Sequence, residues 1–275
     1  MAWPYLVGLT ALVFVPLIGS VMLAFTDYSG IGPVRFNGLD NLTRLVEDDL
    51  FWRSLGNSLF YIIVSVPIRL SCAVGFALLM HRRATLATPG RVGAYLPSVI
   101  PDVAYALLWL WLLNPLYGPI AALVGGAGLP DPLTDPWTAR VAIAVMAAFQ
   151  IGEAFIVALA ARRTIPERLY EAAAVDGASP WFVLRKITLP VMAPIIGLLA
   201  LRDVILSFQI NFVPALLVTE GGPRLATLYL PLYAYRTAFR YFRLGYASAM
   251  TLTLFVLTAL VVYVQYRLIR RWRAA

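Results

Sequence analysis

Five ionisable residues fall within or near long apolar stretches of this chain, where charged side chains are rare. They are Arg69, Asp102, Glu153, Arg202 and Asp203. A charge at the centre of a membrane helix costs at least about 2.5–3.5 kcal/mol, so such residues face protein, water or one another. These five residues are therefore the first candidates for a functional site, either as the lining of a polar cavity or as structural pairs.

Glu153 is the sharpest candidate among them. In the segment FQIGEAF it lies close to one helical turn from Gln150, so the two polar side chains share a helix face. Both could line a polar cavity, and pairing of Glu153 with another helix for structure alone is the competing interpretation.

A second polar group follows further along the chain. Arg202 and Asp203 are adjacent, so they point to different faces of a helix and are not expected to pair with each other. One of them could line the same cavity, with Gln209 and Asn211 on the same segment. Arg69 suits a buried structural pair at least as well.

Motifs for catalysis are absent from the sequence. There is no G-x-x-x-x-G-K-[ST] phosphate loop, HExxH, CxxC or G-x-S-x-G, and Cys72 is the single cysteine. We therefore predict no catalytic residue, no metal site and no cofactor bound by this chain. The alternative function is a membrane-embedded glycosyl- or phospho-transferase, and its only support is Asp48-Asp49 and the arginines Arg236, Arg240 and Arg243.

Composition predicts the fold class. The 275 residues are 61% hydrophobic and 13% charged, which indicates an all-α membrane protein. Six apolar segments approach the ~20 residues that a spanning helix needs. They form one transmembrane domain over 1–275, with spans near 4–26, 55–80, 92–114, 139–161, 189–213 and 247–267.

Basic residues predict the orientation of these spans. Twelve Lys and Arg residues lie in the 81–91 loop, the 162–188 loop and the C-terminal tail, and eight lie on the other side. Cytoplasmic loops carry the excess of Lys and Arg, so both termini are expected in the cytoplasm. The net charge of +8 is explained in this way without a nucleic-acid partner.

The 162–188 loop carries helix signals of its own. Thr164 and Glu167 fit a capping box, the run LYEAAAV favours helix, and Gly177 is a natural stop. A second short helix is expected from Ser179-Pro180 to about Ile187. A link lying on the membrane and a docking surface for another protein are equally compatible with these signals.

Short motifs in this loop resemble a known family. The sequences Glu171-Ala172-Ala173, Asp176-Gly177-Ala178 and Ile187-x-Leu189-Pro190 resemble the "EAA" loop of binding-protein-dependent ABC importer permeases. Further segments resemble the carbohydrate permeases of maltose, lactose and glycerol-phosphate type, and the first of their two paired subunits in particular. These segments are FNGLDNL at 36–42, NSLF at 57–60, 95–118, TEGGP at 219–223 and GYASA at 245–249.

The resemblance implies a function and a set of partners. The chain would be an inner-membrane permease subunit, not an enzyme, that imports a sugar or related polyol together with a second permease and an extracytoplasmic binding protein. Two ATPase subunits would hold the ATP and Mg, and a cytoplasmic coupling helix between the fourth and fifth spans would dock on them.

The resemblance also assigns roles to residues. The coupling residues would be Leu169, Glu171, Ala172, Ala173, Asp176 and Gly177. The external loop that meets the binding protein would include Thr219, Gly221, Gly222 and Pro223, although an ordinary tight turn needs similar residues. The substrate path would draw on Glu153, Gln150, Arg202, Asp203, Gln209, Asn211 and Trp109. Trp109 could stack on a sugar ring, although packing is the commoner role of such a residue.

Overall fold

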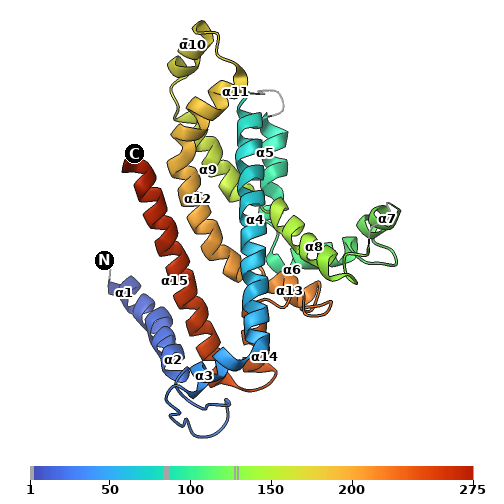
Figure 1. Ribbon diagram of the computed structural model, residues 1–275, viewed down its shortest axis with the longest axis vertical. Coiled ribbons are helices and arrows are strands. Elements are labelled where there is room, and N and C mark those ends of the chain that lie inside the picture. Colours follow the sequence, from blue (N-terminus) through green and yellow to red (C-terminus); the bar gives the residue numbers. More distant parts are fainter. Residues whose placement is uncertain (1–2, 83–86, 127, 129, 275) are drawn as a thin grey trace.

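The chain folds into a bundle of helices around one long central helix (Figure 1). The structure is a computed structural model, and it describes residues 3–82, 87–126, 128 and 130–274. The central helix α4 (Asp49–Arg82) packs against α8 (Pro136–Phe149), α9 (Gly152–Arg163), α12 (Leu189–Ile210) and α14 (Leu230–Phe239). The predicted all-α class is confirmed over the described residues.

Several helices are long and apolar enough to cross a membrane. Within the part of the chain that the structure describes, four single helices pass this test, and there are up to six spans if each of two bent helix pairs counts as one. The four are Trp3–Leu23, Asp49–Met80, Pro180–Leu217 and Leu244–Arg267. The first combines α1 (Trp3–Leu9), a π-helical turn (Thr10–Phe14) and α2 (Val15–Leu23), and the last belongs to α15 (Leu244–Ala274).

The predicted third span, 92–114, is not one straight helix. The helix α5 (Ala87–Tyr95) continues into a 3₁₀ turn (Leu96–Ser98), and α6 (Asp102–Leu112) then leaves at an angle of 100°. Pro101 precedes α6 in an extended conformation with ψ 139°. Proline has no N–H for the helix and disfavours helical backbone before it, so the break falls at this residue.

The predicted fourth span, 139–161, is also broken. The helices α8 and α9 meet at 49°, and the backbone of Gln150 between them has ψ 55°, which a helix cannot continue. The amide of Gly152 donates to Ser98 Oγ at 2.8 Å, which ties this break to the first one. The two bends therefore lie side by side and support each other.

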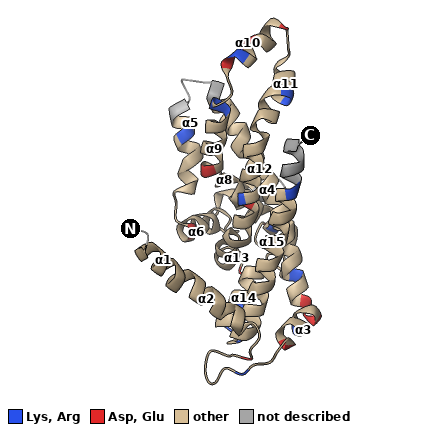
Figure 2. Cartoon of the chain, turned by 90° about the vertical axis from the view of Figure 1, so that its left-hand side faces the viewer, with Lys and Arg blue, Asp and Glu red and all other residues tan. Residues whose placement is uncertain are grey.

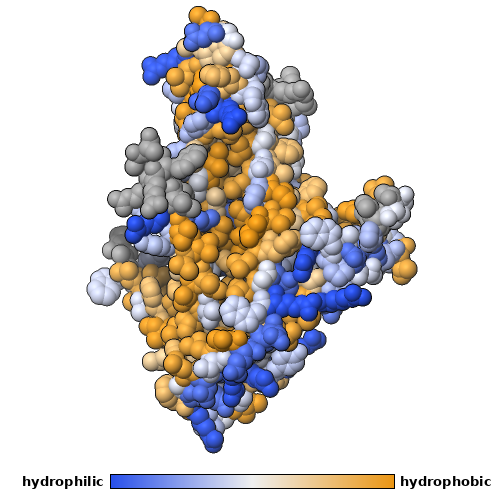
Figure 3. Space-filling model, in the orientation of Figure 1, coloured by the Kyte–Doolittle hydropathy of each residue, from blue (hydrophilic) through white to orange (hydrophobic). Residues whose placement is uncertain are grey.

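Short helices occupy the connecting segments, where the sequence predicted only loops. They are α3 (Asp40–Glu47), α7 (Pro119–Gly126) and α14, whereas α13 (Phe212–Leu217) forms the last part of the span Pro180–Leu217. Between the polar ends of the molecule lies a broad apolar belt (Figure 3). Figure 2 shows charged residues gathered towards the two ends, with α10 (Glu167–Val175) at one end and α3 at the other.

Candidate functional site

Among the described residues, two ion pairs join helices of the bundle. Arg69 on α4 donates from Nη2 to Oδ1 of Asp203 on α12, and both residues are buried, at 6% and 3% exposed. Arg202, next along α12, donates from Nη2 to Oε2 of Glu153 on α9. Arg202 and Asp203 thus point to different helix faces and have separate partners, as their adjacency predicts.

The Arg69–Asp203 pair belongs to a polar seam between α4 and α12, which we define as Ser65, Arg69, Asp203, Ser207 and Asn211. All five residues are buried, and they repeat at every fourth position on the two helices. Each has at least one side-chain N or O atom without a hydrogen-bond partner among the described residues. The seam is therefore a buried polar contact between the two helices and not part of the surface.

The Glu153–Arg202 pair is different because it is exposed. The Glu153 side chain is 61% exposed and that of Arg202 is 45% exposed, although both lie in apolar helices. Together with Tyr95 and Leu199 they line a pocket of about 330 Å³. Gln150 lies half-buried at the α8–α9 break, so it does not share a helix face with Glu153 as predicted, and it is not among the residues that line this pocket. An exposed ion pair at this depth requires a polar surrounding.

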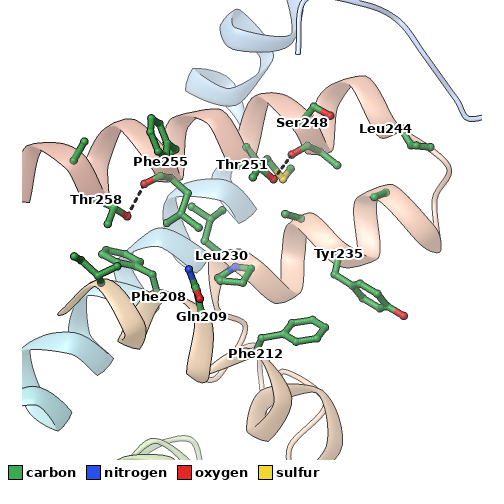
Figure 4. Close-up of a pocket in the computed structure, with 18 of the residues that line it drawn as sticks. Phe208, Gln209, Phe212, Leu230, Tyr235, Leu244, Ser248, Thr251, Phe255 and Thr258 are labelled. Atoms are coloured by element: carbon green, nitrogen blue, oxygen red, sulfur yellow. Dashed lines mark hydrogen bonds between the residues drawn. The ribbon is translucent and has the colours of Figure 1, made fainter. Parts of the chain in front are cut away.

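A larger pocket of about 870 Å³ lies between α12, α14 and α15 (Figure 4). Its wall is mostly apolar and aromatic, with Phe208, Phe212 and Phe255 among its residues. The hydroxyls of Thr251 and Thr258 donate to carbonyls of their own helix, at 3.0 and 2.8 Å. Gln209 is the exposed amide in this wall, so this pocket offers few polar groups to a solute.

Three of the predicted path residues do not reach the surface. Trp109 is 6% exposed and packs between Tyr105 and Phe149 in the core. Asp203 and Asn211 lie in the polar seam. In this structure these three side chains are buried between helices.

The loop with the sequence TEGGP has a backbone conformation that is well defined by its φ angles and hydrogen bonds. Glu220 and Gly221 have positive φ angles of 48° and 73°, and the Gly222–Pro223 peptide is cis. The Thr227 hydroxyl donates to the Gly222 carbonyl at 2.7 Å, and Thr219 Oγ1 lies 2.6 Å from Thr227 Oγ1. Glycine at 221 suits the left-handed backbone there.

Side chains from three other helices hold this loop. Asn57 donates to the carbonyls of Leu225 and Leu228 at 2.8 and 3.1 Å. Arg140 donates to the Ala226 carbonyl and to Asn57 Oδ1. Arg53 and Arg236 donate to the carbonyls of Arg224 and Glu220, at 2.7 and 2.8 Å. Such extensive anchoring exceeds what an ordinary tight turn needs.

Sequence reasoning missed these anchors. In the sequence, Arg140 and Arg53 stand out only as positive charges that flank predicted spans, and Asn57 only as part of the NSLF segment. Their carbonyl partners lie far away in the sequence, so no local pattern points to them. Asn57, a single amide at the start of an apolar segment, is the one feature of the sequence that could have indicated these anchors.

Asp48 is the hub of a second polar cluster. Its Oδ2 accepts hydrogen bonds from the hydroxyls of Tyr233 and Tyr246 at 2.7 and 2.6 Å, and its Oδ1 accepts the backbone N–H groups of Leu50 and Phe51. Burial by itself would raise the pKa of Asp48, but these four hydrogen bonds together hold the pKa below its ordinary value. Burial and donation to Asp48 raise the pKa of Tyr233.

These contacts weaken the support for a transferase. The Asp48 carboxylate caps the start of α4 and ties it to α14 and α15. Arg236 is engaged with the Glu220 carbonyl. Asp48 and Arg236, two of the five residues behind the transferase alternative, are therefore engaged in contacts that hold the structure together.

The 162–188 loop forms a helix, a turn and the start of the next long helix. The N–H of Gly177 donates to the Ala174 carbonyl and the N–H of Ala178 to the Ala173 carbonyl, with φ +68° at Gly177, which is a Schellman motif. Leu169, Ala172, Ala173, Asp176 and others line a pocket of about 520 Å³ between α10 and the following helix. Glu171, Ala172, Asp176 and Gly177 are exposed, while Ala173 is buried.

Two local predictions for this loop are wrong. Thr164 does not form a capping box, because it ends α9 and its hydroxyl donates back to the Ala161 carbonyl at 2.8 Å. The second short helix is not separate. The helix α11 (Pro180–Val183) runs through a π-helical turn (Leu184–Thr188) into α12, so this long helix already begins at Pro180.

Comparisons with known proteins agree with this architecture. A family model described as "Binding-protein-dependent transport system inner membrane component" matches residues 68–274. The probable ABC transporter permease protein YesP of Bacillus subtilis is 32% identical over 98% of this chain and 89% of the relative. The lactose transport system permease protein LacF of Rhizobium radiobacter is 30% identical over 96% of this chain and 92% of the relative.

A solved structure shares the same fold. It is the bacterial alginate ABC transporter in complex with an alginate pentasaccharide-bound periplasmic protein. One of its chains has a TM-score of 0.86 and 25% identity, over 98% of this chain and 93% of its own length. The chain therefore belongs to the binding-protein-dependent transport system inner membrane component family, as a multi-pass permease of a carbohydrate ABC importer and not an enzyme.

Proposed function

We propose that this chain lines half of the translocation path of an ATP-driven importer for a sugar or related polyol. The observation that carries the proposal is the exposed Glu153–Arg202 pair within two apolar helices. Charges at this depth are costly against lipid, so the face that carries them is turned towards a water-filled path. The path is completed by a second, homologous permease subunit.

The chemistry of this face suits a polyhydroxylated solute. Glu153 offers acceptors, Arg202 offers donors, and Tyr95, which is 39% exposed, adds an aromatic surface. A sugar that loses its water needs such groups to re-pair its hydroxyls. Relatives named for transport of lactose and of sulfoquinovosyl glycerol support the same class of solute. Gln150 and Gln209 are further candidates on neighbouring surfaces.

The two ends of the molecule carry the contacts with partners. The anchored loop at 219–223, with Thr219, Gly221, Gly222 and Pro223, would meet the extracytoplasmic binding protein. The helix α10 would dock on one of two ATPase subunits, which hold ATP and Mg. This arrangement requires both termini in the cytoplasm, as the arginine bias favours.

The shape of the 167–178 region supports the coupling role. Glu171 and Asp176 are exposed and can pair with basic residues of a partner, and the small Ala172 allows close approach. The Schellman turn at Gly177 fixes the angle at which α10 meets the next helix. Leu169 adds an apolar contact at the edge of the pocket between them.

The translocation proposal is tested by exchanging the two charges. Uptake would be measured in proteoliposomes that hold the assembled transporter and its binding protein. Glu153→Gln and Arg202→Gln are each expected to lower uptake about tenfold or more, because each removes a hydrogen bond to a charged group. The double variant that exchanges the charges, Glu153→Arg with Arg202→Glu, should recover most of the uptake. Asp102→Asn, at an exposed helix start, is the matched control and should change little. Normal uptake in both single variants would refute the proposal.

The coupling proposal has a separate test. Glu171→Ala and Gly177→Val should weaken retention of the ATPase and substrate-stimulated ATP hydrolysis. Gly177→Asn should be tolerated because asparagine accepts positive φ far better than valine does. Val175→Ala, at an exposed position of α10, controls for changes in the helix that do not alter the turn. Unchanged assembly and stimulation with Gly177→Val would mean that the loop is only a link.

A further inference from the structure

Arg162 is a buried cation that the transport chemistry does not use. It lies in the last turn of α9 and is only 8% exposed. Its Nη1 atom has no hydrogen-bond partner among the described residues. A buried guanidinium without a full set of partners is costly, so its retention calls for a ligand.

The guanidinium is held in place by an aromatic ring. The Cζ atom of Arg162 lies 4.1 Å from the ring centroid of Tyr170 on α10. The Tyr170 hydroxyl is in turn 3.0 Å from Thr188 Oγ1, at the start of α12. This chain of contacts fixes the charge without neutralising it.

Arg162 and Tyr170 line a pocket of about 270 Å³. The remaining wall is largely apolar and includes Leu78, Leu79 and Trp181. Leu79 is 59% exposed and Trp181 is 68% exposed, so this wall continues onto the outer surface of the bundle. The pocket therefore has a positive polar end and an apolar exit.

The pocket also lies at the ends of three candidate membrane helices. Leu79 is next to the end of the span Asp49–Met80, Arg162 is next to the end of the bent pair at Arg163, and Trp181 follows the start of the span Pro180–Leu217. This is the level at which lipid headgroups meet protein, and exposed tryptophan is typical of it. The surrounding loop is basic overall, with five Lys or Arg against three Asp or Glu over 162–188.

We propose that this pocket binds the phosphate of an anionic phospholipid at the membrane surface. Arg162 donates to phosphate oxygens, and the Leu79–Trp181 wall accepts the upper part of an acyl chain. The basic loop disfavours the cationic headgroup of a zwitterionic lipid. Bound lipid would then brace Tyr170 on α10 against the ends of α4 and α12. This inference does not depend on the identity of the transported solute.

Thermal unfolding of the assembled transporter tests the proposal. Samples in zwitterionic detergent would receive phosphatidylglycerol, phosphatidylcholine or inorganic phosphate. Ligand that binds only the folded state raises the unfolding temperature, and we expect a rise of roughly 5 °C with phosphatidylglycerol at concentrations well above Kd. Arg162→Gln should lose this rise. Arg163→Gln, which removes an adjacent but exposed positive charge, should keep it.

The variant Arg162→Gln also distinguishes a ligand site from a structural residue. Without lipid, it should be at least as stable as the natural chain, because it removes a buried charge with an unsatisfied donor. If it does not fold, Trp181→Ala alters only the exposed wall, and native mass spectrometry should then show fewer retained phosphatidylglycerol molecules.

Three results would overturn the proposal. The first is an equal rise in Arg162→Gln and the natural chain, or no rise in either. The second is an equal rise with inorganic phosphate alone, which would make the site one for a free anion. The third is that Arg162→Gln no longer retains the ATPase while lipid has no effect on the unfolding temperature. That result would make a carboxylate of the ATPase subunit the partner of Arg162.

Discussion

At the scale of single residues, two chemically alike carboxylate–arginine pairs have different roles because their surroundings differ. Asp203 and Glu153 are both carboxylates paired with an arginine in apolar helices. One pair is buried between α4 and α12, and the other is exposed beside Tyr95. Exposure, and not charge, therefore separates the structural pair from the candidate path.

The sequence identified these residues but not their partners. Apolar surroundings made Arg69, Glu153, Arg202 and Asp203 visible as candidates, and adjacency correctly separated Arg202 from Asp203. The partners lie on helices that are distant in the sequence, so the pairing depended on the packing of α4, α9 and α12. The burial of Trp109 also depends on helix packing, so the sequence alone did not predict it.

Breaking the buried pair should destabilise the protein more than removing it altogether. Arg69→Met leaves the Asp203 carboxylate buried and unpaired, and we expect a loss of about 3–5 kcal/mol in the free energy of unfolding. Arg69→Met combined with Asp203→Leu should recover much of that loss. Denaturant unfolding of both variants checks this, and a double variant no more stable than the single one would contradict it.

Asp48 predicts a dependence of stability on pH. Its folded-state pKa lies below the unfolded value, so its contribution is present above the unfolded pKa and is lost as pH falls through the folded pKa. Asp48→Asn should therefore lower stability at pH 7, by about 1.5–3 kcal/mol for hydrogen bonds to a charged group, and have less effect in acid. Thermal unfolding from pH 7 down to pH 3 measures this. An equal deficit at every pH would show that the carboxylate charge is irrelevant.

At the scale of elements, the apolar segments were predictable and their breaks were not. Length and hydropathy alone place the six apolar segments, because a span needs a long run of apolar residues. The 49° bend has no proline to mark it, and the hydrogen bond from the Gly152 N–H to Ser98 Oγ joins the two bends across segments that are far apart in the sequence. The capping box at Thr164 failed because α9 extends through Arg163 and uses Thr164 at its own end.

The contact between the two bends gives a prediction for transport. A Cβ atom at Gly152 would lie 2.7 Å from Ser98 Oγ and 2.8 Å from Tyr95 Cδ2. Gly152→Ala should therefore push α9 away from the segment that carries Tyr95, at a cost of about 1–3 kcal/mol, and reduce uptake. Gly93→Ala on α5 meets nothing within 4 Å and serves as the control, with uptake unchanged. Equal uptake in the two variants would mean that the bends are not fixed by this contact.

At the scale of the whole molecule, the chain sorts its polar groups to two ends and to one internal face. The loop at 219–229 connects α13 to α14, in the half of the molecule away from α10 (Figure 1), and is anchored by Asn57, Arg140, Arg53 and Arg236. Between these ends, the exposed Glu153–Arg202 pair interrupts the apolar belt. A permease needs this arrangement, since it must connect a solute supplied on one side to an ATPase on the other.

The most direct measurement is whether water reaches position 153 in the assembled transporter. In a Cys72→Ser background, Glu153→Cys would be treated with a charged thiol reagent that does not enter lipid. We predict rapid labelling that transported solute slows, and no labelling of Leu260→Cys, which replaces an exposed apolar residue of α15. If Glu153→Cys is as unreactive as Leu260→Cys in every state of the transport cycle, then this face does not line the path.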